Sequence, residues 1–159
     1  MKLIQQLFLP LLLFFINTSI AQTTAIPDQN FEQALIDLNI DSDNMVNGQV
    51  LTADISGIIE LDFTGLNPST ITDFSGIEDF TALEILNLRS ADVFLTEDQA
   101  DVFNSNLNLK EFIANDSSFD TYPFTYIPFL DFSNLNNLEY IGLYNSAQIH
   151  SINLDNPNF

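Results

Sequence analysis

Residues 71–88 read ITDFSGIEDFTALEILNL, and the spacing of their apolar side chains decides the fold. Large apolar residues stand at every third position and, at the end, two positions apart: Ile71, Phe74, Ile77, Phe80, Leu83, Leu86 and Leu88. A spacing of three fits neither an α-helix nor a β-strand. It is typical of a chain that winds round a narrow coil and turns one side chain inward at each step. The final spacing of two indicates a short strand.

The strand pattern Leu-x-x-Leu-x-Leu, with other apolar residues at some positions, occurs four times along the chain. The copies begin at Ile58, Leu83, Leu109 and Leu138, so they are 25, 26 and 29 residues apart. These intervals lie within or at the edge of the range for leucine-rich repeats. The sequence therefore predicts an α/β repeat solenoid, a leucine-rich-repeat right-handed coil with a parallel β ladder. In the late coils a second straight segment is predicted, because residues 127–134 match residues 149–156 at a shift of 22.

The chain is predicted to divide into three parts. Residues 1–21 are interpreted as a secretory signal peptide, with Lys2, an apolar run shorter than the roughly 20 residues of a membrane-spanning helix, and small residues before the cleavage site. Residues 22–57 are predicted to form an N-terminal helical cap and connecting loop, and residues 58–159 the leucine-rich repeats, irregular and ending mid-array. The protein is therefore expected to be secreted or on the cell surface, with no membrane span in the mature chain.

Within the cap, residues 27–38 are predicted to form a helix with Pro27 in its first turn. Phe31, Leu35 and Leu38 form its apolar stripe, which is suited to cover the first coil. Two insertions interrupt the repeats. Residues 96–103 are predicted to form a short helix capped by a threonine, and the aromatic, proline-rich residues 119–132 either form a ligand-binding ridge or pack over an irregular coil.

The charge and composition exclude several kinds of partner and chemistry. The chain has 22 acidic residues against three basic ones, Lys2, Arg89 and Lys110, and a formal net charge of −19. Such a charge repels nucleic acids and anionic lipids, so no nucleic-acid partner is expected. There is no cysteine, which excludes disulfides, thiolate ligands and a cysteine nucleophile. The 46% apolar content and 15 phenylalanines favour a packed core over disorder.

The sequence supports no enzymatic site. His150 is the only histidine, which argues against a zinc centre or a Ser-His-Asp triad. Paired acids could hydrolyse a glycoside, but among 22 acidic residues their proximity is unspecific. A carbohydrate-active enzyme is the less favoured interpretation, and it requires a cleft with paired acids.

The candidate binding surface is the outward face of the repeated strands. Stacking places their outward residues in three columns: Glu60, Ile85, Glu111, Tyr140; Asp62, Asn87, Ile113, Gly142; and Thr64, Arg89, Asn115, Tyr144. Tyrosine and apolar anchors within an acidic face suit protein recognition. The predicted binding residues are Ile85, Asn87, Arg89, Glu111, Ile113, Tyr140 and Tyr144. The alternative is that these side chains only pack beside one another along the ladder.

A candidate calcium loop lies between the predicted cap helix and the first strand, in the stretch DSDNMVNGQVLTAD at 41–54. It follows the EF-hand order Asp-x-Asp, Asn-Gly and a later acid, with two extra residues between the halves. The candidate metal ligands are Asp41, Asp43, Asn47 and Asp54. The alternative is a solvated turn with no ion. With calcium bound, the chain could serve as a stiffened structural adhesin or spacer, the second function considered.

Three stretches resemble secreted leucine-rich-repeat surface proteins of Bacteroidetes, which are internalin-like. AIPDQNFEQALIDLNIDSDNMVNGQVLTADISGIIELDFTG is similar to their N-terminal cap, ITDFSGIEDFTALEILNL resembles the internalin-type repeat, and NLEYIGLYNSAQIHSINLDNPN resembles their 21-residue repeat. The resemblance implies a surface protein exported by type IX secretion. From its strand surface and its lack of catalytic groups, the chain is expected to be a non-enzymatic module that binds a protein or surface glycan. It also implies that the chain is the N-terminal fragment of a longer protein.

Overall fold

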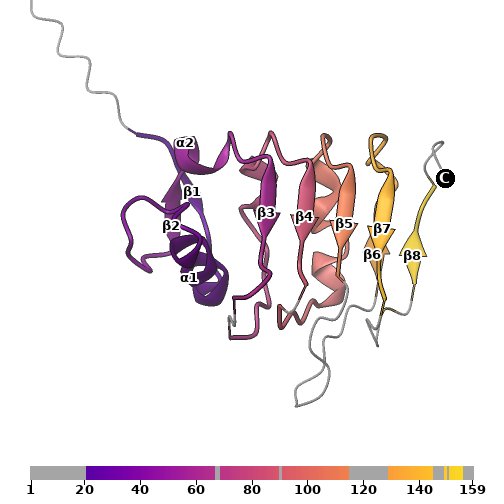
Figure 1. Ribbon diagram of the computed structural model, residues 1–159, viewed down its shortest axis with the longest axis horizontal. Coiled ribbons are helices and arrows are strands. Elements are labelled where there is room, and N and C mark those ends of the chain that lie inside the picture. The colour runs from indigo at the N-terminus through magenta and orange to yellow at the C-terminus, as the bar shows by residue number, and fades with distance from the viewer. Residues whose placement is uncertain are drawn as a thin grey trace, which may run out of the picture.

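The computed structural model describes residues 21–66, 69–89, 91–114, 129–144, 149 and 151–155. Short strands stand side by side in a row, with a helix at the N-terminal end of the row (Figure 1). In chain order the elements are β1 (Thr23–Ala25), α1 (Gln29–Asp37), β2 (Gln49–Leu51), α2 (Thr52–Ile55), β3 (Glu60–Asp62), η1 (Ile77–Asp79), β4 (Ile85–Asn87), η2 (Glu97–Gln99), η3 (Val102–Ser105), β5 (Glu111–Ile113), β6 (Leu130–Asp131), β7 (Tyr140–Gly142) and β8 (Ile152–Asn153), where η denotes a 3-10 helix.

The predicted parallel ladder is confirmed. Strands β3, β4, β5 and β7 form one four-stranded sheet in that order, and each adjacent pair is parallel. Each strand is the centre of one of the four Leu-x-x-Leu-x-Leu copies, and the central apolar residues are paired across the ladder: Leu61, Leu86, Phe112 and Ile141. One strand per coil, repeated at 25 to 29 residues, is the arrangement of a leucine-rich repeat.

The second register is confirmed as well. Strands β6 and β8 are parallel, and Leu130 pairs with Ile152, which is the predicted shift of 22. An isolated parallel bridge joins Ile71 to Val93, also 22 residues apart. The early coils therefore carry a second straight segment too, which the sequence predicted only for the late ones.

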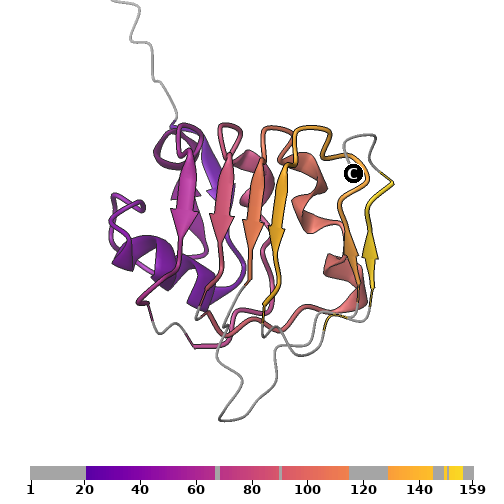
Figure 2. The ribbon, with the colours of Figure 1, turned by 45° about the vertical axis from the view of Figure 1, so that its right-hand side comes forward.

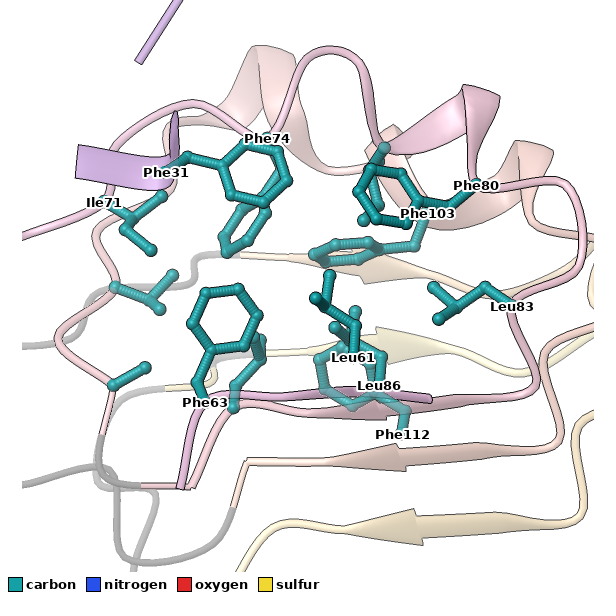
Figure 3. Close-up of a cluster of buried hydrophobic side chains, with 14 of the residues drawn as sticks. Phe31, Leu61, Phe63, Ile71, Phe74, Phe80, Leu83, Leu86, Phe103 and Phe112 are labelled. Carbon is teal, nitrogen blue, oxygen red and sulfur yellow. The ribbon is translucent and has the colours of Figure 1, made fainter. Parts of the chain in front are cut away.

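The core consists of the side chains that every coil turns inward. The seven apolar residues at the repeating positions of the stretch 71–88 are all buried, none more than 1% exposed. Through the core runs a chain of neighbouring phenylalanine rings with centroids 5.0 to 5.4 Å apart, seen in part in Figure 3: Phe31, Phe74, Phe103, Phe112 and Phe132. Ring pairs at this distance add about 0.5–1.5 kcal/mol each beyond the burial of their area. We call this chain the phenylalanine spine; it joins α1 to successive coils.

Helix α1 begins two residues later than predicted. Its N-cap is Asp28, whose Oδ1 accepts hydrogen bonds from the backbone N–H groups of Asn30 (2.8 Å) and Phe31 (3.0 Å). Pro27 therefore precedes the N-cap, and its predicted place in the first turn was wrong. The helix begins after Asp28 because the Asp28 side chain accepts hydrogen bonds from the first free backbone N–H groups. The predicted stripe is confirmed for Phe31 and Leu35, which are fully buried, and Leu38 is partly buried.

Asp28 also fastens α1 to the first coil. Its Oδ2 accepts from the backbone N–H and the hydroxyl of Thr72, at 2.7 and 2.9 Å, and from the N–H of Asp73 at 3.2 Å. Burial raises the pKa of Asp28, but the hydrogen bonds from Thr72, Phe31 and Asn30 outweigh burial and leave the pKa below its usual value. One carboxylate thus holds the start of a helix and a backbone segment 44 residues away.

The insertion at 96–103 is not one α-helix. Two separate 3-10 helices, η2 and η3, occupy this region, and Thr96 makes no capping hydrogen bond to the backbone. Its hydroxyl is turned instead to the side chain of Asp98, which leaves the first turn without the stabilisation that the prediction assumed.

Several predictions concern residues outside the described part. Residues 1–20 of the predicted signal peptide, residues 119–128 of the aromatic insertion and His150 lie outside it, and so does Asn115 of the third column. Phe132, at the end of the aromatic insertion, is described and is buried. In the part that the structure describes, no helix has the length and apolar character to cross a membrane.

Candidate functional site

The outward residues of the parallel strands form the first two of the three columns that the sequence predicted. The ladder pairs Glu60 with Ile85, Ile85 with Glu111, and Glu111 with Tyr140. It pairs the second column in the same way: Asp62, Asn87, Ile113 and Gly142. We call this surface the strand face; it lies on the side of the row of strands away from η2 and η3 (Figure 2).

The strand face exposes large side chains at its C-terminal end. Tyr140 is 49% exposed and Tyr144 is 72% exposed, whereas Ile85 and Ile113 are half-buried between their neighbours. Ile59, beside the first column, is 58% exposed, and the sequence-based prediction did not include it. Five of the predicted binding residues are therefore in register on one surface: Ile85, Asn87, Glu111, Ile113 and Tyr140. Their role in binding stays a prediction.

Charges on the strand face are mostly negative. The Lys110 ammonium lies 2.8 Å from the Glu84 carboxylate, in the neighbouring coil, and this hydrogen bond raises the pKa of Lys110 above its usual value, against burial, which lowers it. This pairing leaves Arg89 to balance the remaining acids of the face: Glu60, Asp62, Glu111 and Glu139. The predicted columns included neither Glu84 nor Lys110, although their positions two residues before the central apolar residue place them on the same ladder.

Side-chain hydrogen bonds order the backbone at the C-terminal ends of β3 and β4. The Asn87 side chain accepts from the N–H of Arg89 (3.1 Å) and donates to the hydroxyl of Thr64 (3.2 Å). The Asp62 carboxylate accepts from the N–H of Thr64 at 2.8 Å. Asn87 therefore fixes the backbone that presents Arg89, which is a positioning role on the strand face.

The predicted calcium ligands Asp41, Asp43 and Asn47 lie in the acidic loop, which we define as residues 39–48, and Asp54 lies in α2. Asp41 is only 1% exposed; its Oδ1 accepts from the N–H of Asp43 (3.2 Å), and its Oδ2 is buried without a hydrogen-bond partner. Burial raises the pKa of Asp41, and the nearby carboxylates of Asp43, Glu32 and Asp54 raise it further, against the opposing effect of the Asp43 N–H. Within the described residues no three His, Cys, Asp or Glu side chains are gathered so that they could hold a metal ion.

The end of the acidic loop is held by Glu32, a residue that the sequence-based prediction missed. Glu32 is fully buried, and its carboxylate accepts from the backbone N–H groups of Asn47 (2.9 Å), Gly48 (2.9 Å) and Gln49 (3.1 Å). Its signal in the sequence is its position next to Phe31, on the buried side of α1. Asn47 itself donates from its side chain to Asp43 at 2.8 Å.

A polar pocket of about 300 Å³ opens beside the 3-10 helices. It is lined by Ser75, Glu78, Asp98, Gln99, Asp101, Val102 and Ser105. Glu78 accepts from the N–H of Gly76 (2.8 Å), and Asp98 is bonded to Thr96. These two acids thus have structural partners, and their gathering follows from the local turns.

No protein-family model matches this chain, and no curated protein matches it in sequence. Solved structures do match. The functional domain of InlJ from Listeria monocytogenes, described as including a cysteine ladder, is 22% identical with a TM-score of 0.52, over 76% of this chain and 23% of that one. The internalin InlF of the same species is 21% identical (TM-score 0.48, 84% and 38%), and the internalin InlC2 is 16% identical (TM-score 0.39, 85% and 79%).

The similarity to InlJ shows that the two chains share a fold. This chain spans about a quarter of the InlJ domain's length. The shared architecture agrees with the parallel ladder and with the repeat spacing of the four strands.

Proposed function

We propose that this protein is an exported, non-enzymatic module that binds a protein partner through its strand face. The carrying observation is the registered set of accessible side chains on the parallel ladder, with Tyr140 and Tyr144 at one end and Ile85 and Ile113 at the centre. Tyrosine and aliphatic anchors dominate the energetics of protein interfaces. Parallel repeats hold such residues on a rigid framework. Little conformational entropy is therefore lost when a partner binds them.

The charge of the strand face favours a partner with basic residues. Glu111 stands beside Ile113 and Tyr140, and Lys110 is already neutralised by Glu84. A partner with lysine or arginine round an apolar centre would be steered to this surface and would bind faster at low salt. A neutral glycan, the alternative partner, would show little dependence on salt.

Export and capping complete the proposal. The predicted signal peptide supports export to the medium or the cell surface, and the resemblance to Bacteroidetes surface proteins supports a type IX route and a longer parent protein. The position of α1 at the N-terminal end of the row, with Phe31 against Phe63, Phe74 and Phe80, supports its role as the cap of the first coil.

Site-specific photo-crosslinking tests the strand face. Benzoylphenylalanine at Ile113 is expected to crosslink to a partner selected from a displayed library of extracellular domains, whereas the same residue at Asp98, in η2, is not. Replacing both Tyr140 and Tyr144 with alanine is expected to abolish the crosslink. The matched control is Leu107→Ala, which removes a side chain 58% exposed outside the columns. Equal crosslinking from both positions, or no effect of the tyrosine changes, contradicts the proposal.

The structural spacer remains the second candidate function. It differs in a measurable way, because a spacer makes no partner contact through the strand face and the tyrosine variants would then leave attachment unchanged. Its one specific support is the buried, unpartnered carboxylate oxygen of Asp41 in the acidic loop. An enzymatic role has no comparable support, and incubation of the purified chain with glycan substrates is expected to release no sugar.

A further inference from the structure

The acidic loop contains a buried negative charge that nothing nearby balances. Asp41 is only 1% exposed, and its Oδ2 has no hydrogen-bond partner although its Oδ1 has one. Burying a carboxylate oxygen without a partner is strongly unfavourable unless the oxygen meets a proton or a cation. The arrangement is therefore incomplete as a purely protein structure.

Among the described residues, no basic side chain is available to complete it. Residues 21–66 contain eight acidic residues and not one lysine, arginine or histidine. Lys110 is held by Glu84, and Arg89 stands on the strand face. The described part of the chain therefore supplies no counter-charge for Asp41.

Helix α1 adds to the negative potential at the same place. The N–H groups of Ile40 and Asp41 donate back to the carbonyl oxygen of Leu35, at 2.9 and 3.3 Å, so Asp41 lies at the C-terminal end of the helix. The last turn of α1 contains no basic residue. Because a helix C-terminus carries partial negative charge, a cation is favoured there and a bare carboxylate is not.

The loop follows the order of an oxygen-ligand calcium loop in sequence, and local hydrogen bonds shape its first turns. The N–H of Asp43 donates to Asp41, and the N–H of Met45 donates to Asp43 at 2.8 Å. Gly48 has φ +84°, the left-handed conformation that the sharp turn of such loops requires. Asp54, in α2, accepts from the N–H of Ser42 at 3.1 Å, so the last acid already lies beside the first.

We propose that the acidic loop binds one Ca²⁺ ion, with Asp41 Oδ2 at its centre and the carboxylates of Asp43 and Asp54 closing onto it. Closure is needed because the three carboxylates are not gathered in the described conformation. It exchanges the contact of Ser42 with Asp54 for the ion, while the hydrogen bond from Asn47 continues to hold Asp43. Asn47 acts as a positioning residue for Asp43, which differs from its predicted role as a ligand.

The ion selected is calcium and the affinity is low. Flexible oxygen ligands at irregular spacing suit Ca²⁺, whereas Mg²⁺ demands near-octahedral geometry and keeps its waters. Asp54 is shorter than the glutamate that ends a tight loop, and two extra residues lengthen the path. A dissociation constant of roughly 10⁻⁴ to 10⁻³ M is therefore expected, the range of extracellular calcium modules. The proposal is independent of partner binding at the strand face.

The test is calorimetric titration of the full chain with CaCl₂, together with melting curves in EDTA and in about 10 mM CaCl₂. One ion per chain and a rise in melting temperature of about 3–8 °C are expected. Asp41→Asn is expected to abolish both, and also to raise the melting temperature in EDTA because the unbalanced charge is gone. The matched control Asp37→Asn removes one exposed charge at the nearby end of α1 and is expected to keep both.

A second variant tests the geometry by gain of affinity. Asp54→Glu supplies the longer carboxylate and is expected to tighten calcium binding by about tenfold. The proposal is overturned if calcium gives no melting shift, if MgCl₂ gives the same shift as CaCl₂, or if Asp41→Asn and Asp37→Asn behave alike. The last two outcomes identify general screening of an acidic surface. The crosslinking at Ile113 is unaffected in either case, so the two proposals succeed or fail separately.

Discussion

The repeats differ in their interactions from the cap junction, the name that we give to the place where the predicted cap (residues 22–57) meets the first coil. The repeats are stabilised by inward apolar side chains and a backbone ladder, both of which recur from coil to coil. At the junction, the packing of Phe31 against the first coil is supplemented by polar contacts that each occur once: Asp28 with Thr72 and Asp73, Asn30 with the carbonyl of Thr70, and Thr24 with Asp79. A periodic array distributes its stability over many small terms, whereas a junction concentrates it in a few residues. Substitutions should therefore separate the two regions.

The largest expected effect is in the phenylalanine spine. Phe112→Ala removes a fully buried ring that lies 5.4 Å from Phe103 and 5.0 Å from Phe132. The lost burial and the cavity are expected to lower the free energy of unfolding by about 3–5 kcal/mol. Urea unfolding followed by circular dichroism measures this loss. Phe94→Ala, at a ring 37% exposed, serves as control and should cost clearly less. Equal losses would mean that the spine has no special role.

The next largest effect is at the closest approach of cap and coil. A Cβ on Gly76 would stand 2.4 Å from the Ile26 side chain and 2.6 Å from the Ala25 carbonyl oxygen, and Gly76 has φ +98°. Gly76→Ala is therefore expected to destabilise the protein by about 2–4 kcal/mol, through strain and displacement of β1. Urea unfolding of the variant and the parent protein measures this loss.

Gly65→Ala is the matched control for Gly76. Gly65 has φ +82°, but a Cβ added there would meet no atom within 4 Å, so its substitution reports the backbone strain alone. That strain is expected to cost about 1 kcal/mol. Equal unfolding free energies for the two variants would show that β1 and the residues next to it are not closely packed against Gly76.

A pH-dependent effect is expected at Asp28. Its folded-state pKa lies below the ordinary value of 3.8, so the charged form stabilises the fold above that pH and this contribution is lost as the pH falls through the folded-state pKa. Asp28→Asn is expected to cost about 1–3 kcal/mol at neutral pH and progressively less below about pH 4. Unfolding curves of both proteins between about pH 7 and pH 3 measure the convergence. A constant difference across this range would mean that the Asp28 charge contributes nothing.

The sequence predicted the repeats well because their information is periodic. Three patterns recur along the chain: the spacing of Ile71 to Leu88, the four strand copies and the 22-residue shift. A pattern that recurs can be recognised from the sequence alone. The strand-face columns followed directly, since a strand alternates its faces. The role of these residues in binding stays a prediction.

The cap junction could not be predicted in the same way. Nothing in the sequence links Asp28 to Thr72 or Glu32 to Gly48, because such contacts depend on how the helix docks and occur once. The calcium hypothesis named Asp41 from its motif, but only the structure shows that one of its oxygens is buried without a partner. The start of α1 was misplaced for a related reason, since Pro27 and Asp28 both suit a helix start and the competition is decided by the capping bonds.

The smallest effect is expected for Lys110→Gln, and its dependence on salt concentration distinguishes the exposed Lys110–Glu84 pair from the Asp28 contacts. Lys110→Gln breaks the 2.8 Å ion pair with Glu84. The Lys110 side chain is 44% exposed and the Glu84 side chain 39%, and exposed pairs contribute little to stability. Little change in melting temperature is expected at low salt, and none in about 0.5 M NaCl, where the Debye length is about 4 Å. The Asp28 contacts are largely buried, so the cost of Asp28→Asn should persist in the same salt. If salt removed the Asp28 effect as well, the junction would be held by long-range charge and not by its hydrogen bonds, and the contrast between the two regions would disappear.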